Sequence, residues 1–150
     1  MLGTNKDGTV AVIPFWHRAR VQGLIRRKLE GEPKYLYPKA GEFPGGHRPL
    51  FIPAPLRAGA LLVEGIVDAL AGAALEEATI AVGGAGLSGN QIRELENVPG
   101  PLYILPDADK AGEEAAQKLV RALYPKALLC PPRYGDDLKD VADLYRLRVE

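Results

Sequence analysis

Three acidic residues follow short apolar runs in the second half of the chain, and their placement predicts a metal site. Glu64 comes directly after residues 61–63, and Asp107 and Asp109 come after residues 102–106. In an open α/β sheet the carboxyl ends of parallel strands share one edge, so we expect these carboxylates to lie together. Carboxylates that crowd together repel one another unless a cation lies between them. Mg²⁺, or Mn²⁺ in its place, is the simplest cation for an all-oxygen site of this kind.

Three further acids are candidate auxiliary ligands: Asp68, Asp140 and Asp143. Asp68 falls in the first turn of a predicted helix, where the helix dipole alone favours a negative charge. Asp140 and Asp143 are three residues apart, so they share a face of the last predicted helix, which is also typical of a solvated surface. Asp137 is the residue that we expect to cap that helix.

The elements that would position these acids alternate between strand and helix from residue 58 onward. Apolar runs predict strands over residues 60–63, 79–82, 102–105 and 126–130, and amphipathic patterns predict helices over 66–75, 88–96, 111–123 and 138–146. This alternation predicts an α/β fold with a mainly parallel sheet flanked by helices. Ser88 is a good helix N-cap, and Pro106 lacks a ladder donor and therefore suits the end of a strand.

Residues 1–57 differ in character and predict a small basic subdomain in front of the α/β domain at 58–150. Strands are expected over 9–15 and 20–27, antiparallel to each other, and the Pro- and Gly-containing stretch 38–58 is typical of an ordered loop or linker. Residues 1–58 carry ten Lys/Arg and four Asp/Glu, a net charge of +6, whereas residues 59–150 carry nine and fifteen, a net of −6. A basic surface beside an acidic pocket suits a polyanion, although ordinary surface charge gives the same count.

Composition excludes several classes of protein. The chain has 150 residues, 47% of them hydrophobic, which suits one compact domain with a small appendage. Cys130 is the only cysteine, so an intramolecular disulfide is excluded, and with His17 and His47 it does not make a structural zinc site of the usual kind. The sequence has neither a signal peptide nor an apolar run of about 20 residues. We therefore expect a cytoplasmic protein with no membrane partner.

A glycine motif supports a competing interpretation. Residues 84–89, Gly-Ala-Gly-Leu-Ser-Gly, follow a predicted strand and open a predicted helix, as in the dinucleotide-binding fingerprint, and Asp107 lies about twenty residues further on. However, a complete strand–helix unit precedes the glycines, and this interpretation gives no role to Glu64 or to the basic amino-terminal part. We keep a dinucleotide-binding domain as a remote alternative.

The acidic motifs, taken in order, resemble the Toprim domain, and most closely the catalytic core of bacterial-type DNA primases. Glu64-Gly-Ile-Val-Asp68 is similar to the first Toprim motif. Asp107-Ala-Asp109-Lys-Ala-Gly is similar to the second, with Ala108 where these primases typically carry Gly, and 139–144 is similar to the late acidic motif. In the basic part, Pro33-Lys34-Tyr35-Leu36 and the strand from Arg20 to Arg27 resemble the primase amino-terminal subdomain.

This resemblance implies a function and a set of site residues. It implies metal-dependent nucleotidyl transfer that makes a primer from nucleoside triphosphates on single-stranded DNA. Glu64, Asp107 and Asp109 would be the catalytic acids that hold Mg²⁺ or Mn²⁺, with the three auxiliary acids around them. The residues that would bind template or nucleotide are Arg26, Arg27, Lys34, Tyr35 and Lys110. Tyr35 would stack on a base, although a core tyrosine is an equally good interpretation.

Two other functions share the same core and stay open. A small Toprim nuclease would use the metal site to cleave nucleic acid, and a binding module would hold nucleic acid or nucleotide without turnover. Full-length primases also carry a zinc-binding domain and a region that contacts the replicative helicase, and neither fits within these 150 residues. We therefore expect a minimal relative or a fragment, with a zinc-binding domain or helicase as a possible partner.

Overall fold

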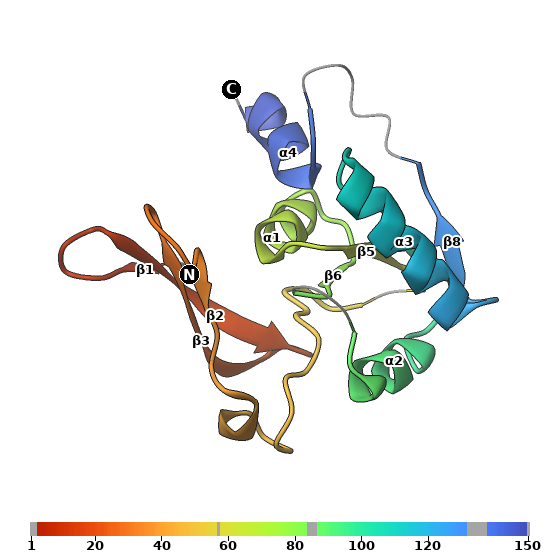
Figure 1. Ribbon diagram of the computed structural model, residues 1–150, viewed down its shortest axis with the longest axis horizontal. Coiled ribbons are helices and arrows are strands. Elements are labelled where there is room, and N and C mark those ends of the chain that lie inside the picture. The colour runs from red at the N-terminus through yellow and green to blue at the C-terminus, as the bar shows by residue number, and fades with distance from the viewer. Residues whose placement is uncertain (1–2, 57, 84–86, 132–137, 150) are drawn as a thin grey trace. The chain divides into compact units, whose positions relative to one another are not determined.

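The computed structural model describes residues 3–56, 58–83, 87–131 and 138–149 (Figure 1). The chain divides into two compact units, Met1–Pro49 and Leu50–Glu150. Phe51 belongs with the second unit because it forms an antiparallel bridge with Ala81. The sequence predicts a division after residue 57 between two subdomains with different roles, and this division stays a prediction.

The first unit is a four-stranded antiparallel sheet, and its two long strands are those that the sequence predicts. β2 (Val10–His17) pairs with β3 (Arg20–Lys28). β1 (Gly3–Thr4) and β4 (Tyr35–Leu36) complete the order β1-β2-β3-β4. The sequence does not reveal these two edge strands, because two residues are too few for an alternating pattern to show.

The core of the first unit is built from alternate residues of its long strands. Ile13 and Phe15 of β2 lie two residues apart and are both buried, as is Ile25 of β3. The Pro- and Gly-containing stretch that follows is ordered: the 3₁₀ helix η1 (Ala40–Glu42) leads to Phe43, whose ring meets that of Phe15 edge-on at 4.9 Å between centroids. The predicted loop therefore supplies part of the core.

The second unit is the predicted α/β domain. Its strands are β5 (Ala60–Val63), β6 (Thr79–Ala81), β7 (Leu102–Ile104) and β8 (Ala127–Leu129). All are parallel, in the order β6-β5-β7-β8. Their inward side chains are almost entirely buried, among them Leu62, Ile80, Leu102 and Ile104. β5 and β6 are largely buried on both faces, which explains why they show as short apolar runs in the sequence, whereas Tyr103 of β7 and Leu128 and Leu129 of β8 are exposed.

Helices cover both faces of this sheet. They are α1 (Ile66–Ala74), α2 (Gly89–Glu96), α3 (Lys110–Leu123) and α4 (Val141–Val149). α1 packs against α4, and α2 packs against α3, and Figure 1 shows these two pairs on opposite sides of the sheet. In the part of the chain described here, no helix has both the length and the apolar character needed to cross a membrane.

The helix boundaries confirm one capping prediction and correct another. Ser88 is the N-cap of α2: its Oγ accepts from the Gln91 backbone N–H, and the Gln91 side chain accepts from the Ser88 backbone N–H at 2.9 Å. The last helix, however, begins at Val141 rather than at residue 138 and ends three residues later than predicted. Asp140 makes the capping bond here, and the predicted cap, Asp137, lies outside the described residues.

Candidate active site

The carboxyl ends of β5 and β7 form the switch point of the parallel sheet. The two strands are neighbours, yet β5 leads into α1 on one face while β7 leads into α3 on the other. Connections that diverge in this way leave room for a ligand beyond the strand ends. Glu64 follows β5 directly, and Asp107 follows Pro106 just beyond β7. A cavity of about 410 Å³ lies between the sheet and the helices α2 and α3 and reaches Glu64, Pro106 and Gly112, but Asp107 and Asp109 are not among its lining residues.

Asp107 is partly buried and lies among the negative charges of other carboxylates. Burial, and then the negative charges of four other carboxylates, raise the pKa of Asp107 to about 7. In decreasing order of effect, those carboxylates belong to Asp68, Glu64, Asp140 and Asp109. Residues far apart in the sequence therefore face one region of space, as the motifs require. A site of this kind favours a bound cation, because a cation relieves the repulsion between its carboxylates.

Asp109 combines its exposed position with a local structural role. It is the N-cap of α3, and its Oδ1 accepts a hydrogen bond from the Gly112 backbone N–H at 2.7 Å. This cap occupies one of its two carboxylate oxygens. Lys110, the first residue of α3, is exposed beside it, at the end of the helix where the dipole favours an anion.

Gly112 is a residue whose role the sequence motif does not disclose. A Cβ at this position would lie 2.6 Å from the carbonyl oxygen of Asp107 and 3.0 Å from its nitrogen. The first turn of α3 therefore packs directly on the backbone that carries Asp107. Only glycine permits this approach, so Gly112 sets the position of the loop between β7 and α3.

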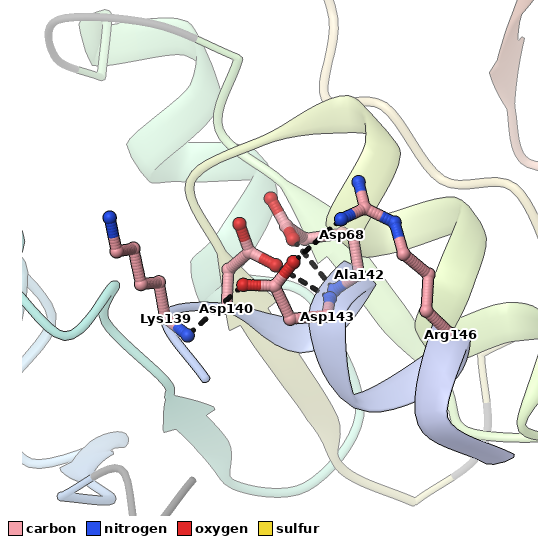
Figure 2. Close-up of polar contacts among 6 residues, drawn as sticks. All are labelled: Asp68, Lys139, Asp140, Ala142, Asp143 and Arg146. Carbon is pink, nitrogen blue, oxygen red and sulfur yellow. Dashed lines mark hydrogen bonds and ion pairs between the residues drawn. The ribbon is translucent and has the colours of Figure 1, made fainter. Parts of the chain in front are cut away.

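The three auxiliary acids meet at the start of α4 (Figure 2), where each accepts a backbone hydrogen bond. Asp68, from α1, accepts from the Ala142 N–H at 3.1 Å. Asp140 accepts from the Asp143 N–H at 2.8 Å. Asp143 accepts from the Lys139 N–H at 3.1 Å and pairs with the Arg146 guanidinium at 2.9 Å. The bonds from Ala142 and Asp143 satisfy N–H groups that the first turn of a helix leaves without an intrahelical partner.

A backbone hydrogen bond joins this cluster to the loop that carries Asp107 and Asp109. The Ala108 N–H donates to the Lys139 carbonyl oxygen at 2.9 Å. Ala108 is exposed, so its methyl group takes no space from the core. All three acidic motifs are thereby connected: the first through α1, the second through the loop before α3, and the third through the start of α4.

The donor set suits a hard divalent cation. Every candidate ligand is a carboxylate, and Mg²⁺ and Mn²⁺ prefer oxygen ligands. As the side chains lie, however, no group of three or more Asp, Glu, His or Cys residues within the described ranges is arranged to hold a metal ion. Mg²⁺ sites of phosphate-transferring enzymes are commonly completed by substrate phosphates and water. The assignment of Glu64, Asp107 and Asp109 as ligands stays a prediction.

The first unit contains two stacked tyrosine rings with an arginine over each, which we call the Arg–Tyr row: Arg27, Tyr35, Tyr37 and Arg48. Arg27 lies over the Tyr35 ring, 5.7 Å from its centroid, and its Nε donates to the Tyr35 hydroxyl at 3.2 Å. The Tyr35 and Tyr37 rings stack with centroids 6.0 Å apart, and Arg48 lies 5.0 Å from the centroid of Tyr37. Burial raises the pKa of Tyr37, so its hydroxyl stays neutral at ordinary pH.

The sequence identifies only part of this row. It assigns a binding role to Arg27 and Tyr35 but none to Tyr37 or Arg48, because the pairing of Arg48 with Tyr37 becomes visible only in the folded chain. Arg26 and Lys34, the other candidates for binding nucleic acid, are exposed. The glycines of the dinucleotide-type motif at 84–86, as well as Asp137, lie outside the described residues.

Comparison with known proteins identifies the second unit. Residues 61–145, more than half of the chain, match the model of the Toprim-like family. No curated protein matches the chain.

Among solved structures, the chain is similar to primase catalytic cores over nearly its whole length. It shares 24% identity and a TM-score of 0.72 with the DnaG primase catalytic domain bound to single-stranded DNA, covering 98% of this chain and 54% of that one. A DNA primase domain from Pseudomonas aeruginosa gives 22% identity and a TM-score of 0.72, covering 97% and 52%. The zinc-binding and RNA polymerase domains of the Aquifex aeolicus primase give 22% and 0.65, covering 99% and 43%. The chain thus spans about half the length of the structures it matches.

Proposed function

This chain belongs to the Toprim-like family, and from that premise we propose that it makes a primer from nucleoside triphosphates on single-stranded DNA by metal-dependent nucleotidyl transfer. The observation that carries the proposal is the meeting of Glu64 and Asp107 at the switch point, with Asp109 at the start of α3. The likeness to primase cores supports it, because that likeness extends over the basic first unit as well as the Toprim domain.

In this proposal Glu64, Asp107 and Asp109 hold the divalent ions, Mg²⁺ or Mn²⁺. Bound ions of this kind activate a terminal hydroxyl and stabilise a leaving pyrophosphate. The chain's own residues position the reactants. Asp109 fixes the first turn of α3, and Lys110 at that turn meets the triphosphate together with the helix N-terminus. Arg26 and Lys34 neutralise template phosphates, and Arg27 and Tyr35 of the Arg–Tyr row support the adjoining bases.

The decisive experiment is a primer-synthesis assay on single-stranded DNA with nucleoside triphosphates, in the presence and absence of Mg²⁺ or Mn²⁺. The variant Asp109→Asn is expected to lose about 100-fold or more in rate, since a metal ion supplies several kcal/mol of transition-state stabilisation. The fold should be retained, because Asn is as good an N-cap as Asp and keeps the bond from the Gly112 N–H.

The matched control is Glu113→Gln, which removes an exposed acid from the same turn of α3. It should leave the rate unchanged. Primer synthesis by Asp109→Asn at the wild-type rate would show that the assignment is wrong. The same reactions distinguish the other Toprim activities: a nuclease shortens the labelled template, and a binding module yields neither product under either metal.

A second prediction concerns template binding by the first unit. Lys34→Gln is expected to weaken binding to single-stranded DNA and to lower the slope of log K against log salt by about 0.7, the contribution of one phosphate contact. A salt titration by fluorescence anisotropy measures both quantities. Lys6→Gln is the control, an exposed lysine of the same unit outside the proposed surface. An unchanged slope for Lys34→Gln would show that Lys34 does not contact a phosphate of the bound DNA.

The proposed partners are single-stranded DNA and nucleoside triphosphates. One similar structure is a primase catalytic domain bound to single-stranded DNA, and another includes a zinc-binding domain. We propose that a zinc-binding domain or a replicative helicase joins this core from another chain or another segment, and that the protein works in the cytoplasm.

A further inference from the structure

The cavity between the sheet and the helices α2 and α3 has no role in the proposed reaction. Its walls are apolar: Leu62 and Ile104 come from the strands, Ile92 from α2 and Leu119 from α3. Protein interiors are close-packed and leave few voids larger than a water molecule. A volume of about 410 Å³ is instead that of a site for a small molecule, which typically measures about 300–1,000 Å³ and has mostly apolar walls.

Small side chains keep the cavity open on the side of α3. The helix lines it with Ala111, Ala115 and Ala122, which are spaced four and seven residues apart and therefore share one face of the helix. Ala111 and Ala122 are exposed, so the cavity reaches solvent along α3 and a ligand can enter it. From Gly112 to Ala122 the helix rises by about 15 Å, which is room for an elongated molecule.

The two ends of the cavity carry opposite charges. Among its described lining residues, Glu64 and Lys118 are charged, and both are exposed. Glu64 lies at the carboxyl end of β5, where its charge adds to those of the other acids around Asp107. Lys118 lies six residues after Gly112, about 9 Å further along α3, and has no such group of like charges beside it within the lining. The Glu64 end is therefore the more strongly charged, and it is negative.

Apolar walls that lead to a negative end are complementary to an amphipathic cation. An apolar body displaces water from the walls, and a positive group reaches Glu64 at the exposed end. A neutral molecule gains only the first of these effects. An anion must either place its charge towards the carboxylates or stay at Lys118, where water screens the attraction.

We propose that this cavity is a binding site for a small amphipathic organic cation, an amine with an aromatic or aliphatic body, whose ammonium group lies at Glu64. The proposal goes beyond primer synthesis and needs neither DNA nor turnover. One consequence does rest on the proposed function: if Glu64 holds a metal ion, the bound amine competes with that ion and inhibits the enzyme.

The test uses three probes with the same apolar body and different charge: phenylbutylamine, phenylbutanol and phenylbutyrate. Each is titrated into the full chain in EDTA at neutral pH, and methyl NMR shifts are followed. Phenylbutylamine should shift the methyl groups of Leu62, Ile92 and Leu119 with a dissociation constant of about 0.1–1 mM, as expected for a ligand of this size. Ile13, in the core of the first unit, is the reference and should not shift.

The charge of the probe should decide its affinity. Phenylbutanol should bind about fivefold more weakly than phenylbutylamine, and phenylbutyrate at least tenfold more weakly. Glu64→Gln keeps the size of the side chain and should abolish the preference for the amine over the alcohol. Equal affinities of wild type for the three probes, or no shift of the cavity methyl groups, would overturn the proposal.

A substitution that fills the cavity tests the site itself. Ala115→Phe places a ring in the cavity and should weaken phenylbutylamine binding at least tenfold. Gln117→Phe is the matched control, because it adds the same ring to an exposed position of α3 that does not line the cavity. Unchanged binding by folded Ala115→Phe would show that the probe binds elsewhere. If Ala115→Phe does not fold, the result for Glu64→Gln decides.

Mg²⁺ separates this proposal from the proposed function. If Glu64 holds the metal, Mg²⁺ should weaken phenylbutylamine binding about fivefold or more and leave phenylbutanol binding unchanged. Phenylbutylamine should then inhibit primer synthesis, and excess Mg²⁺ should relieve the inhibition. Amine binding that Mg²⁺ does not affect would contradict the role of Glu64 as a metal ligand, whereas the probe series and Ala115→Phe would still decide the cavity.

Discussion

Metal-free protein carrying Asp107→Asn is expected to be more stable than wild type at pH 8, and to lose the stabilisation that Mg²⁺ gives to wild type. Burial and the neighbouring acids raise the pKa of Asp107 to about 7 in the folded protein, whereas an unfolded Asp has a pKa of about 3.9. Between these values the folded state binds more protons than the unfolded state. The contribution of Asp107 to the free energy of unfolding of metal-free wild type therefore falls as the pH rises towards 7. Asn removes the charge that causes this loss.

Chemical denaturation at pH 5 and pH 8, with EDTA or with Mg²⁺, measures both effects. The difference between wild type and Asp107→Asn isolates this one carboxylate, because all other groups titrate in both proteins. Mg²⁺ at 100 times its dissociation constant should stabilise wild type by about 2.7 kcal/mol and the variant by much less. If Asp107→Asn is instead the less stable protein in EDTA at pH 8, the carboxylates do not repel one another and the case for a cation between them fails.

The sequence predicts the second unit well because its signals are local. β5, β7 and their neighbours are apolar runs that end within a residue or two of the predicted points. The cap at Ser88 depends only on Ser88 and Gln91, which are three residues apart. The order of the strands is not local, yet the meeting of Glu64 and Asp107 follows from the general rule that parallel strands share one carboxyl edge.

The start of α4 shows what local signals do not contain. Asp137 and Asp140 are equally good caps by residue type, so the sequence alone does not decide between them. A distant side chain also takes part in fixing the helix start, since Asp68 caps Ala142 from α1. The same limit applies to Asp140 and Asp143. Their spacing suits metal ligands, but it does not reveal that each carboxylate accepts a hydrogen bond from a backbone N–H.

The Arg–Tyr row illustrates the same limit in the first unit. Arg27 and Tyr35 face each other because β3 and β4 pair in that register. The segment between Tyr37 and Arg48 contains η1 and Phe43 and has no periodic pattern. The sequence therefore does not predict that Arg48 lies over the Tyr37 ring. Close approaches between backbone segments, such as that at Gly112, are also not predictable from the sequence, because a glycine does not indicate which atoms will pack against it.

Gly112→Ala is therefore expected to damage the site about as severely as the loss of a carboxylate, even though Ala is the better helix former. Ala in place of Gly favours a helix by about 1 kcal/mol, which offsets part of the cost of placing the new Cβ, so we expect the protein to stay folded. The new Cβ, however, would lie 2.6 Å from the Asp107 carbonyl oxygen and 3.2 Å from its carbonyl carbon. These are backbone atoms that no rotamer change moves aside, so α3 and the Asp107 loop must separate.

Such a separation acts on chemistry more than on folding, because a displacement of about 1 Å in a reacting group costs about 100-fold in rate. Primer synthesis by Gly112→Ala should fall by about that factor, and Mn²⁺ should bind more weakly, while denaturation shows a folded protein. Gly89→Ala is the matched control: it lies at the start of α2, and a Cβ there meets no atom of another residue within 4 Å. That variant should keep the wild-type rate at equal or higher stability. Wild-type rates in both variants would show that primer synthesis does not depend on the packing of α3 against the Asp107 backbone. The proposed role of Asp107 as a metal ligand would then be wrong.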